Sequence, residues 1–124
     1  MDVKIECGHL VMEATLFETD TGKMVFDALP LDLSFNTWGD EIYFQIPVEA
    51  GLDDTAREEV SEGDLGYWPN MPAFCIFFGP TPVSTGNRPV AASPVNVFGR
   101  LLHVDPERLS SIPEGENVVV EPAD

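Results

Sequence analysis

The clearest structural signal in the sequence lies at residues 63–79, which read GDLGYWPNMPAFCIFFG. Residues 73–79 are apolar at successive positions, a pattern typical of a core strand that is buried on both faces. Residues 70–72 favour a turn, and residues 63–69 bring the chain back along this strand. The stretch therefore predicts two neighbouring strands in a mainly β domain.

Alternating apolar and polar residues predict further short strands on both sides of this pair. Residues 3–16 alternate around Gly8 and predict an antiparallel hairpin. About eight short strands favour a closed, mainly antiparallel barrel, because closure removes exposed strand edges. The other predicted strands lie at residues 31–35, 41–48, near 60, 95–104 and 118–120.

Two short helices and one long loop complete the predicted domain. Asp20 or Thr21 is the expected cap of the first helix, which Pro30 ends, and Asp105 caps the second. Residues 79–94 carry four prolines and two glycines and predict a long loop of the kind that is often functional.

The length of 124 residues and the 44% hydrophobic content fit a single domain over residues 1–124 with a real core. The sequence has no repeat or linker that would mark a second domain. Apolar runs are too short for a membrane span, and the first residues do not read as a secretion signal. We expect a soluble, cytoplasmic protein.

The net charge of −16 comes from 22 acidic and six basic residues. Such a chain repels nucleic acids and anionic membranes, so we expect neither as a partner. The excess of acid indicates a solvated surface that also suits a salt-rich cytoplasm; the alternative is a cationic partner. Residues 67–104 contain no carboxylate, so they line the core or form the surface least repellent to anions and apolar ligands.

The sequence lacks the motifs of common catalytic and metal sites. It has only two histidines, His9 and His103, and no nucleophile or phosphate-binding motif. Cys7 and Cys75 are too few for a disulfide scaffold or a zinc site, and Cys75 is expected to be a buried thiol. We therefore expect no catalytic residues, no metal and no cofactor.

Aromatic side chains beside turns are the candidates for ligand binding. Tryptophan and tyrosine carry polar groups that need partners, so those flanked by turn residues are expected at the rim of a barrel. Asn96 lies in an apolar strand, and its amide either pins the proline-rich loop or holds a ligand carbonyl. The candidate groove comprises Trp38, Tyr43, Tyr67, Trp68, Phe78, Arg88 and Asn96.

Three blocks of the sequence resemble the small prokaryotic cyclophilin-like proteins, a mostly uncharacterised group. The blocks are NTWGDEIYF at residues 36–44, GDLGYWP at 63–69 with its continuation to 82, and PVNVFGR at 94–100. The resemblance covers nearly the whole chain and implies a closed cyclophilin-like barrel of eight antiparallel strands with two short helices.

True cyclophilins are peptidyl-prolyl isomerases, which lower a barrier of ~18–20 kcal/mol. The resemblance implies an arginine and a histidine for that reaction. Val95 occupies the histidine position, so the histidine is missing. The arginine is expected on the strand after the first helix, but the only basic residue between Lys23 and Arg88 is Arg57, in an acidic stretch, so the arginine is missing too. The pocket can thus persist while the electrostatic part of the catalysis is lost.

Three functions follow from this sequence. The first is a module that binds a peptide or a small molecule without catalysis. The second is a weak prolyl isomerase in which Arg88 or Arg100 replaces the missing arginine. The third is a homodimer or other homo-oligomeric subunit that associates through exposed Trp and Tyr side chains.

Overall fold

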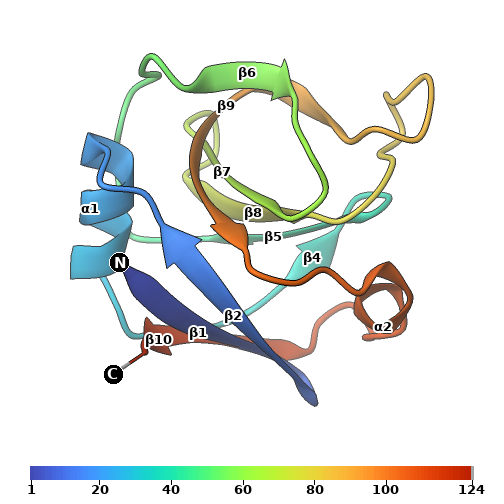
Figure 1. Ribbon diagram of the computed structural model, residues 1–124, viewed down its shortest axis with the longest axis horizontal. Coiled ribbons are helices and arrows are strands. Elements are labelled where there is room, and N and C mark those ends of the chain that lie inside the picture. The colour runs from blue at the N-terminus through green and yellow to red at the C-terminus, as the bar shows by residue number, and fades with distance from the viewer. Residues whose placement is uncertain (124) are drawn as a thin grey trace.

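The computed structural model describes residues 1–123, which form ten strands and two helices. The helices are α1 (Asp20–Asp27) and α2 (Pro106–Ser110), which lie on opposite sides of the molecule in Figure 1. No helix in this part of the chain is long and apolar enough to cross a membrane. The strands are β1 (Asp2–Cys7), β2 (Leu10–Leu16), β3 (Leu31–Ser34), β4 (Asn36–Thr37), β5 (Glu41–Gln45), β6 (Ala56–Glu59), β7 (Asp64–Trp68), β8 (Ala73–Phe77), β9 (Val90–Leu101) and β10 (Asn117–Pro122).

The sheet closes through the chain segment that contains β3 and β4. Paired strands follow the order β3-β10-β1-β2-β9-β7-β8-β5-β4, and every pair is antiparallel. The two ends of this order, β3 and β4, are separated in the chain by Phe35 alone. Counted as one strand, β3 and β4 complete a ring of eight strands. Strand β6 pairs with β9 outside this ring. The predicted eight-stranded antiparallel barrel is confirmed.

The barrel wall carries apolar side chains on both faces where β8 lies. The interior cluster includes Val3, Phe74 and Val118, and the Phe74 ring stacks on Phe44 with centroids 4.8 Å apart. Alternate residues of β8 point the other way, as strand geometry requires. They join an outer cluster of Val60, Ala73, Cys75, Phe77, Ala91, Val95 and Val97. This second cluster explains why the strand is apolar at every position, as predicted.

Strand β9 begins at Val90, so the prediction of a loop that continues to residue 94 was wrong. Glu59 pairs with Val90 and Arg57 with Val95, so a bulge in β9 takes up the intervening residues. Pro94 lies in that bulge, where the strand ladder does not require a hydrogen bond from its backbone nitrogen. The bulged half of β9 lies over the outer face of the barrel and forms one wall of a pocket there.

The two helices differ in how well their starts were predicted. Asp105 caps α2 as predicted and accepts a hydrogen bond from the Arg108 N–H at 3.2 Å. The cap of α1 is Thr19, which accepts from Gly22 N–H at 3.0 Å, so the prediction of Asp20 or Thr21 was wrong. Thr21 is instead buried within the protein.

Asn96 is fully buried and fastens the acidic loop before β6 to the barrel. Its Oδ1 accepts from the Asp53 N–H at 2.9 Å, and its Nδ2 donates to the Gly51 carbonyl at 2.8 Å. The same Nδ2 donates to Thr21 Oγ1 at 3.1 Å, which ties in α1. The amide pins the loop at residues 51–53 and α1, so the alternative in which it pins the proline-rich loop was wrong.

The acidic charge is largely uncompensated by ion pairs, and we expect salt to stabilise the fold. Residues 1–123 form two ion pairs, and both involve Lys4: its ammonium lies 3.4 Å from the Glu6 carboxylate and 3.0 Å from that of Glu121. Added ions screen the repulsion of a chain with a net charge of −16. Calorimetry should therefore show a melting temperature that rises from low to molar sodium chloride. A flat or falling melting temperature would contradict this expectation.

Candidate ligand-binding site

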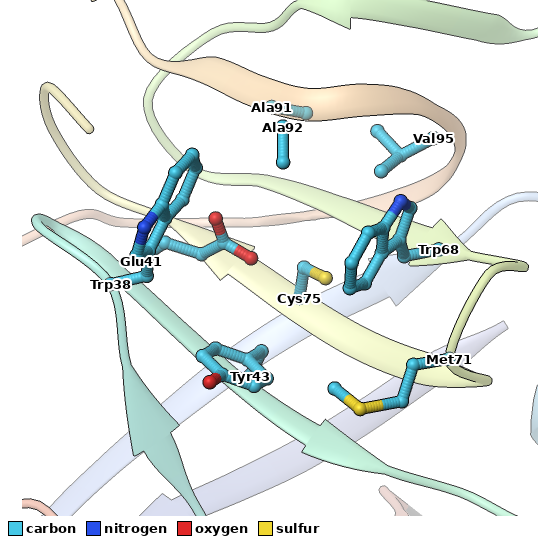
Figure 2. Close-up of a pocket in the computed structure, with 9 residues that line it drawn as sticks. All are labelled: Trp38, Glu41, Tyr43, Trp68, Met71, Cys75, Ala91, Ala92 and Val95. Carbon is cyan, nitrogen blue, oxygen red and sulfur yellow. The ribbon is translucent and has the colours of Figure 1, made fainter. Parts of the chain in front are cut away.

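A pocket of about 250 Å³ opens on the outer face of the barrel, where β9 lies over β5, β7 and β8. In Figure 2, Trp38 and Trp68 stand on opposite sides of it, with the Glu41 carboxylate and Cys75 between them. Most of the wall is carbon and sulfur. The lining residues are Trp38, Glu41, Tyr43, Trp68, Met71, Cys75, Ala91, Ala92 and Val95.

The turn between β4 and β5 positions Trp38. The Trp38 N–H donates to the Glu41 carbonyl at 2.9 Å, which closes the turn. Gly39 within it has a φ of 59°, and a Cβ there would meet Pro82 at 2.8 Å. Only glycine fits both the conformation and the close approach of the proline-rich loop. The turn therefore holds Trp38 at one side of the pocket.

Trp68 is the last residue of β7, and a hydrogen bond holds its side chain against β9. Its indole N–H donates to Ser93 Oγ at 2.6 Å, and Asn70 Nδ2 donates to the same oxygen at 3.2 Å. The polar edge of the ring is thus already satisfied by protein. The apolar part of the ring is what the pocket offers to a ligand.

Glu41 is a buried carboxylic acid at the centre of this apolar wall, with 7% of its surface exposed. Burial raises the pKa of Glu41 to about 7, although a hydrogen bond from the Cys75 thiol works in the opposite direction. No basic side chain lines the pocket, and neither ion pair in residues 1–123 involves Glu41. The carboxyl group therefore changes its charge near neutral pH without a cation to stabilise the ionised form.

The two thiols are both free and buried, as predicted for Cys75. Cys75 is 1% exposed, and burial together with the Glu41 charge raises the pKa of its thiol well above the ordinary value. Burial raises the pKa of the Cys7 thiol to about 12. Cys7 belongs to the interior cluster and Cys75 to the outer one. Both stay protonated at neutral pH, so neither is an activated nucleophile.

The structure brings three of the predicted groove residues together and separates the others. Trp38, Tyr43 and Trp68 line the pocket. Tyr67 and Phe78 point into the barrel interior, where the Tyr67 hydroxyl donates to the Val48 carbonyl at 2.5 Å. Neither is open to a ligand in this pocket. Asn96 also lies outside the lining, with its amide bonded within the protein.

The arginines proposed as replacements for the isomerase arginine do not line the pocket. Arg88 is exposed, and its Nε donates to the Val60 carbonyl at 3.0 Å. Arg100 is exposed on β9, in register with Asp64 of β7. The pocket thus contains a carboxyl group and none of the cationic donors that an isomerase would need.

Six lining residues were not among the predicted site residues: Glu41, Met71, Cys75, Ala91, Ala92 and Val95. A signal for Glu41 was present, because residues two apart on a strand share a face and Glu41 alternates with Tyr43. Cys75 then follows from register, since it pairs with Tyr43 across the ladder. The two alanines depend on the bulge in β9, which sequence periodicity does not reveal.

Comparisons with known proteins agree with this architecture. The family model described as cyclophilin-like matches residues 1–121. The hypothetical protein AF2241 from Archaeoglobus fulgidus, known from a solution structure, is 38% identical with a TM-score of 0.81. That match covers 99% of this chain and 95% of the archaeal one.

A second solved structure shares the fold alone. The protein McbB, solved in complex with tryptophan, is 14% identical with a TM-score of 0.73. The match covers 97% of this chain and 44% of McbB. No curated protein matches the sequence. The matched family model, the identity to AF2241 and the eight-stranded barrel together show that the chain belongs to the cyclophilin-like family.

Proposed function

We propose that this protein is a binding module that takes a compact, largely apolar ligand in the pocket between Trp38 and Trp68. The ligand is a small molecule or a side chain of a peptide. The observation that carries the proposal is the wall itself: two indoles, a phenol, a thioether and three aliphatic side chains around one carboxyl group. Apolar cavities with a few convergent polar groups are typical ligand sites.

The same wall argues against prolyl isomerisation as the function of this pocket. Lowering the barrier to rotation requires a donor that favours the twisted amide. Neither Arg88 nor Arg100 lines the pocket, and Val95 stands at the position that the family resemblance gives to histidine. Binding without acceleration is therefore the expected behaviour toward proline-containing peptides.

Filling the pocket should abolish ligand binding. Ala92 is exposed and lines the pocket, so the Ala92→Phe variant places a ring in the cavity without disturbing the barrel interior. Benzyl alcohol and cyclohexanol, titrated against tryptophan fluorescence and amide chemical shifts, are expected to bind the wild type. We expect Ala92→Phe to weaken binding at least about tenfold, or ~1.4 kcal/mol. Leu102→Phe adds a ring at an exposed position outside the pocket and should leave affinity unchanged.

Two results would overturn the proposal. One is equal binding of these probes to the wild type and to Ala92→Phe, which would locate the ligand elsewhere. The other is acceleration of isomerisation in a panel of X-Pro peptides, assayed beside a true cyclophilin. If that acceleration disappears in Arg88→Ala or Arg100→Ala, the protein is an isomerase with a substitute arginine.

A further inference from the structure

We propose that the ligand of this pocket carries a methylated ammonium group, which lies against the Glu41 carboxylate and among the rings of Trp38, Tyr43 and Trp68. The inference rests on the proposed function, because it names the ligand class of the same site. It is independent of whether the cation is a free small molecule or part of a modified peptide side chain.

The first argument is that Glu41 lacks a countercharge. An ionised carboxylate in an apolar wall is costly unless a cation or several donors stabilise it. Glu41 has the Cys75 thiol beside it, and no basic side chain shares the lining. A cationic group in the cavity would supply the missing charge.

The second argument is the arrangement of the rings. In Figure 2 the Glu41 carboxylate points into the space between the two indoles, and Tyr43 lies to one side of it. The faces of tryptophan and tyrosine rings attract cations, and such rings in combination recognise quaternary ammonium groups. The aromatic rings and the Glu41 carboxylate would therefore both attract the cationic group of the ligand.

The third argument concerns the kind of cation. A primary ammonium is strongly hydrated and has three donors to satisfy, whereas this wall offers few acceptors besides Glu41. Methyl groups on the nitrogen remove donors and add apolar surface that matches Met71, Ala91 and Val95. An anionic ligand would meet Glu41 and a net charge of −16, both repulsive.

The affinity for such a cation should depend on pH through Glu41. The titratable groups that line the pocket with it are the Tyr43 phenol on β5 and the Cys75 thiol on β8. The lining residues from β7, β9 and the turn before β8, which are Trp68, Ala91, Ala92, Val95 and Met71, carry no ionisable group. Above neutral pH, Glu41 is ionised and attracts the cation; in acid it is neutral and that attraction is lost.

The test compares choline with its neutral isostere 3,3-dimethylbutan-1-ol by calorimetry and tryptophan fluorescence. At pH 8, choline should bind the wild type at least about tenfold more tightly than the isostere. Glu41→Gln should remove this preference while it retains affinity for the isostere. In the wild type, choline affinity should rise about fivefold to tenfold from pH 6 to pH 8, and isostere affinity should not.

The outcomes separate this inference from the proposed function. If the isostere binds as tightly as choline, or the preference survives Glu41→Gln, the cation inference is wrong and the binding module stands. If neither compound nor the neutral probes bind, both are wrong. The wild-type pH series decides the matter without any variant, since a pH-independent ratio of choline to isostere affinity overturns the inference.

A second pair of ligands distinguishes the two sources of the cation. A short peptide with Nε-trimethyl-lysine is compared with the same peptide carrying norleucine. Tighter binding of the trimethyl-lysine peptide than of choline supports a peptide source. Tighter binding of choline supports a free small cation, and a norleucine peptide that binds equally well contradicts the role of charge.

Discussion

Glu41→Gln should stabilise the fold by up to about 3 kcal/mol above pH 7 and change it little at pH 4. The glutamine keeps the shape of the side chain and removes its charge. In the wild type, burial raises the pKa of Glu41 from 4.5 to about 7. Between these values the unfolded chain releases a proton that the folded protein keeps, so wild-type stability falls as pH rises and levels off above the folded pKa. The variant escapes this loss because its side chain does not titrate.

Urea unfolding followed by tryptophan fluorescence from pH 4 to pH 9 measures the difference. Glu58→Gln is the matched control, because Glu58 is exposed on β6. Its unfolding free energy should follow the wild type within about 0.5 kcal/mol across the range. A Glu41→Gln difference that is the same at every pH would show that Glu41 does not titrate in this window.

The result would bear directly on ligand binding. A carboxylate that destabilises the empty protein is a group kept for something other than stability. If Glu41 behaves as expected, occupation of the pocket by a cation should restore part of the lost stability at pH 8. The unfolding and binding experiments would then both measure the effect of the Glu41 charge.

Asn96→Ala should destabilise the protein by about 2–4 kcal/mol, because it removes at once the three hydrogen bonds made by a fully buried side chain. The change leaves the Asp53 N–H and the Gly51 carbonyl without their partner and loosens Thr21 of α1. Buried polar groups that lose their partners cost more than the bonds themselves contribute. We therefore expect an unfolding midpoint at markedly lower urea concentration.

An exposed asparagine provides the comparison for this variant. Asn87 lies on the surface of the proline-rich loop, and Asn87→Ala should change stability by less than about 0.5 kcal/mol. A loss below about 1 kcal/mol for Asn96→Ala would mean that water or a neighbouring group replaces the amide. The binding site offers a further check, since Asn96 is outside the pocket and its loss should leave affinity in the folded protein intact.

Most of the strands could be predicted from the sequence because their evidence is local. Alternation of apolar and polar residues was sufficient to predict the first hairpin, and an uninterrupted apolar run was sufficient to predict β8. The start of β9 could not be predicted, because Pro94 indicates a loop unless a bulge accommodates it. The bulge exists only in the context of the pairing with β6.

The candidate site was partly predictable for the same reason. Trp38 and Trp68 stand beside turns, which places them at a rim. Tyr67 and Phe78 were grouped with them although neighbouring residues on a strand face opposite sides, so Tyr67 points inward where Trp68 points outward. Strict use of that alternation would have excluded Tyr67 and included Glu41.

By itself, the sequence determined most of the strands, the large negative net charge and the absence of the isomerase arginine and histidine from the positions that the family resemblance assigns. Only the tertiary structure decided that Glu41 is buried without a cation and that β9 lies over it. The reason is physical: periodicity describes one strand at a time. The charge state and the surroundings of a side chain depend on which distant segments exclude water from it.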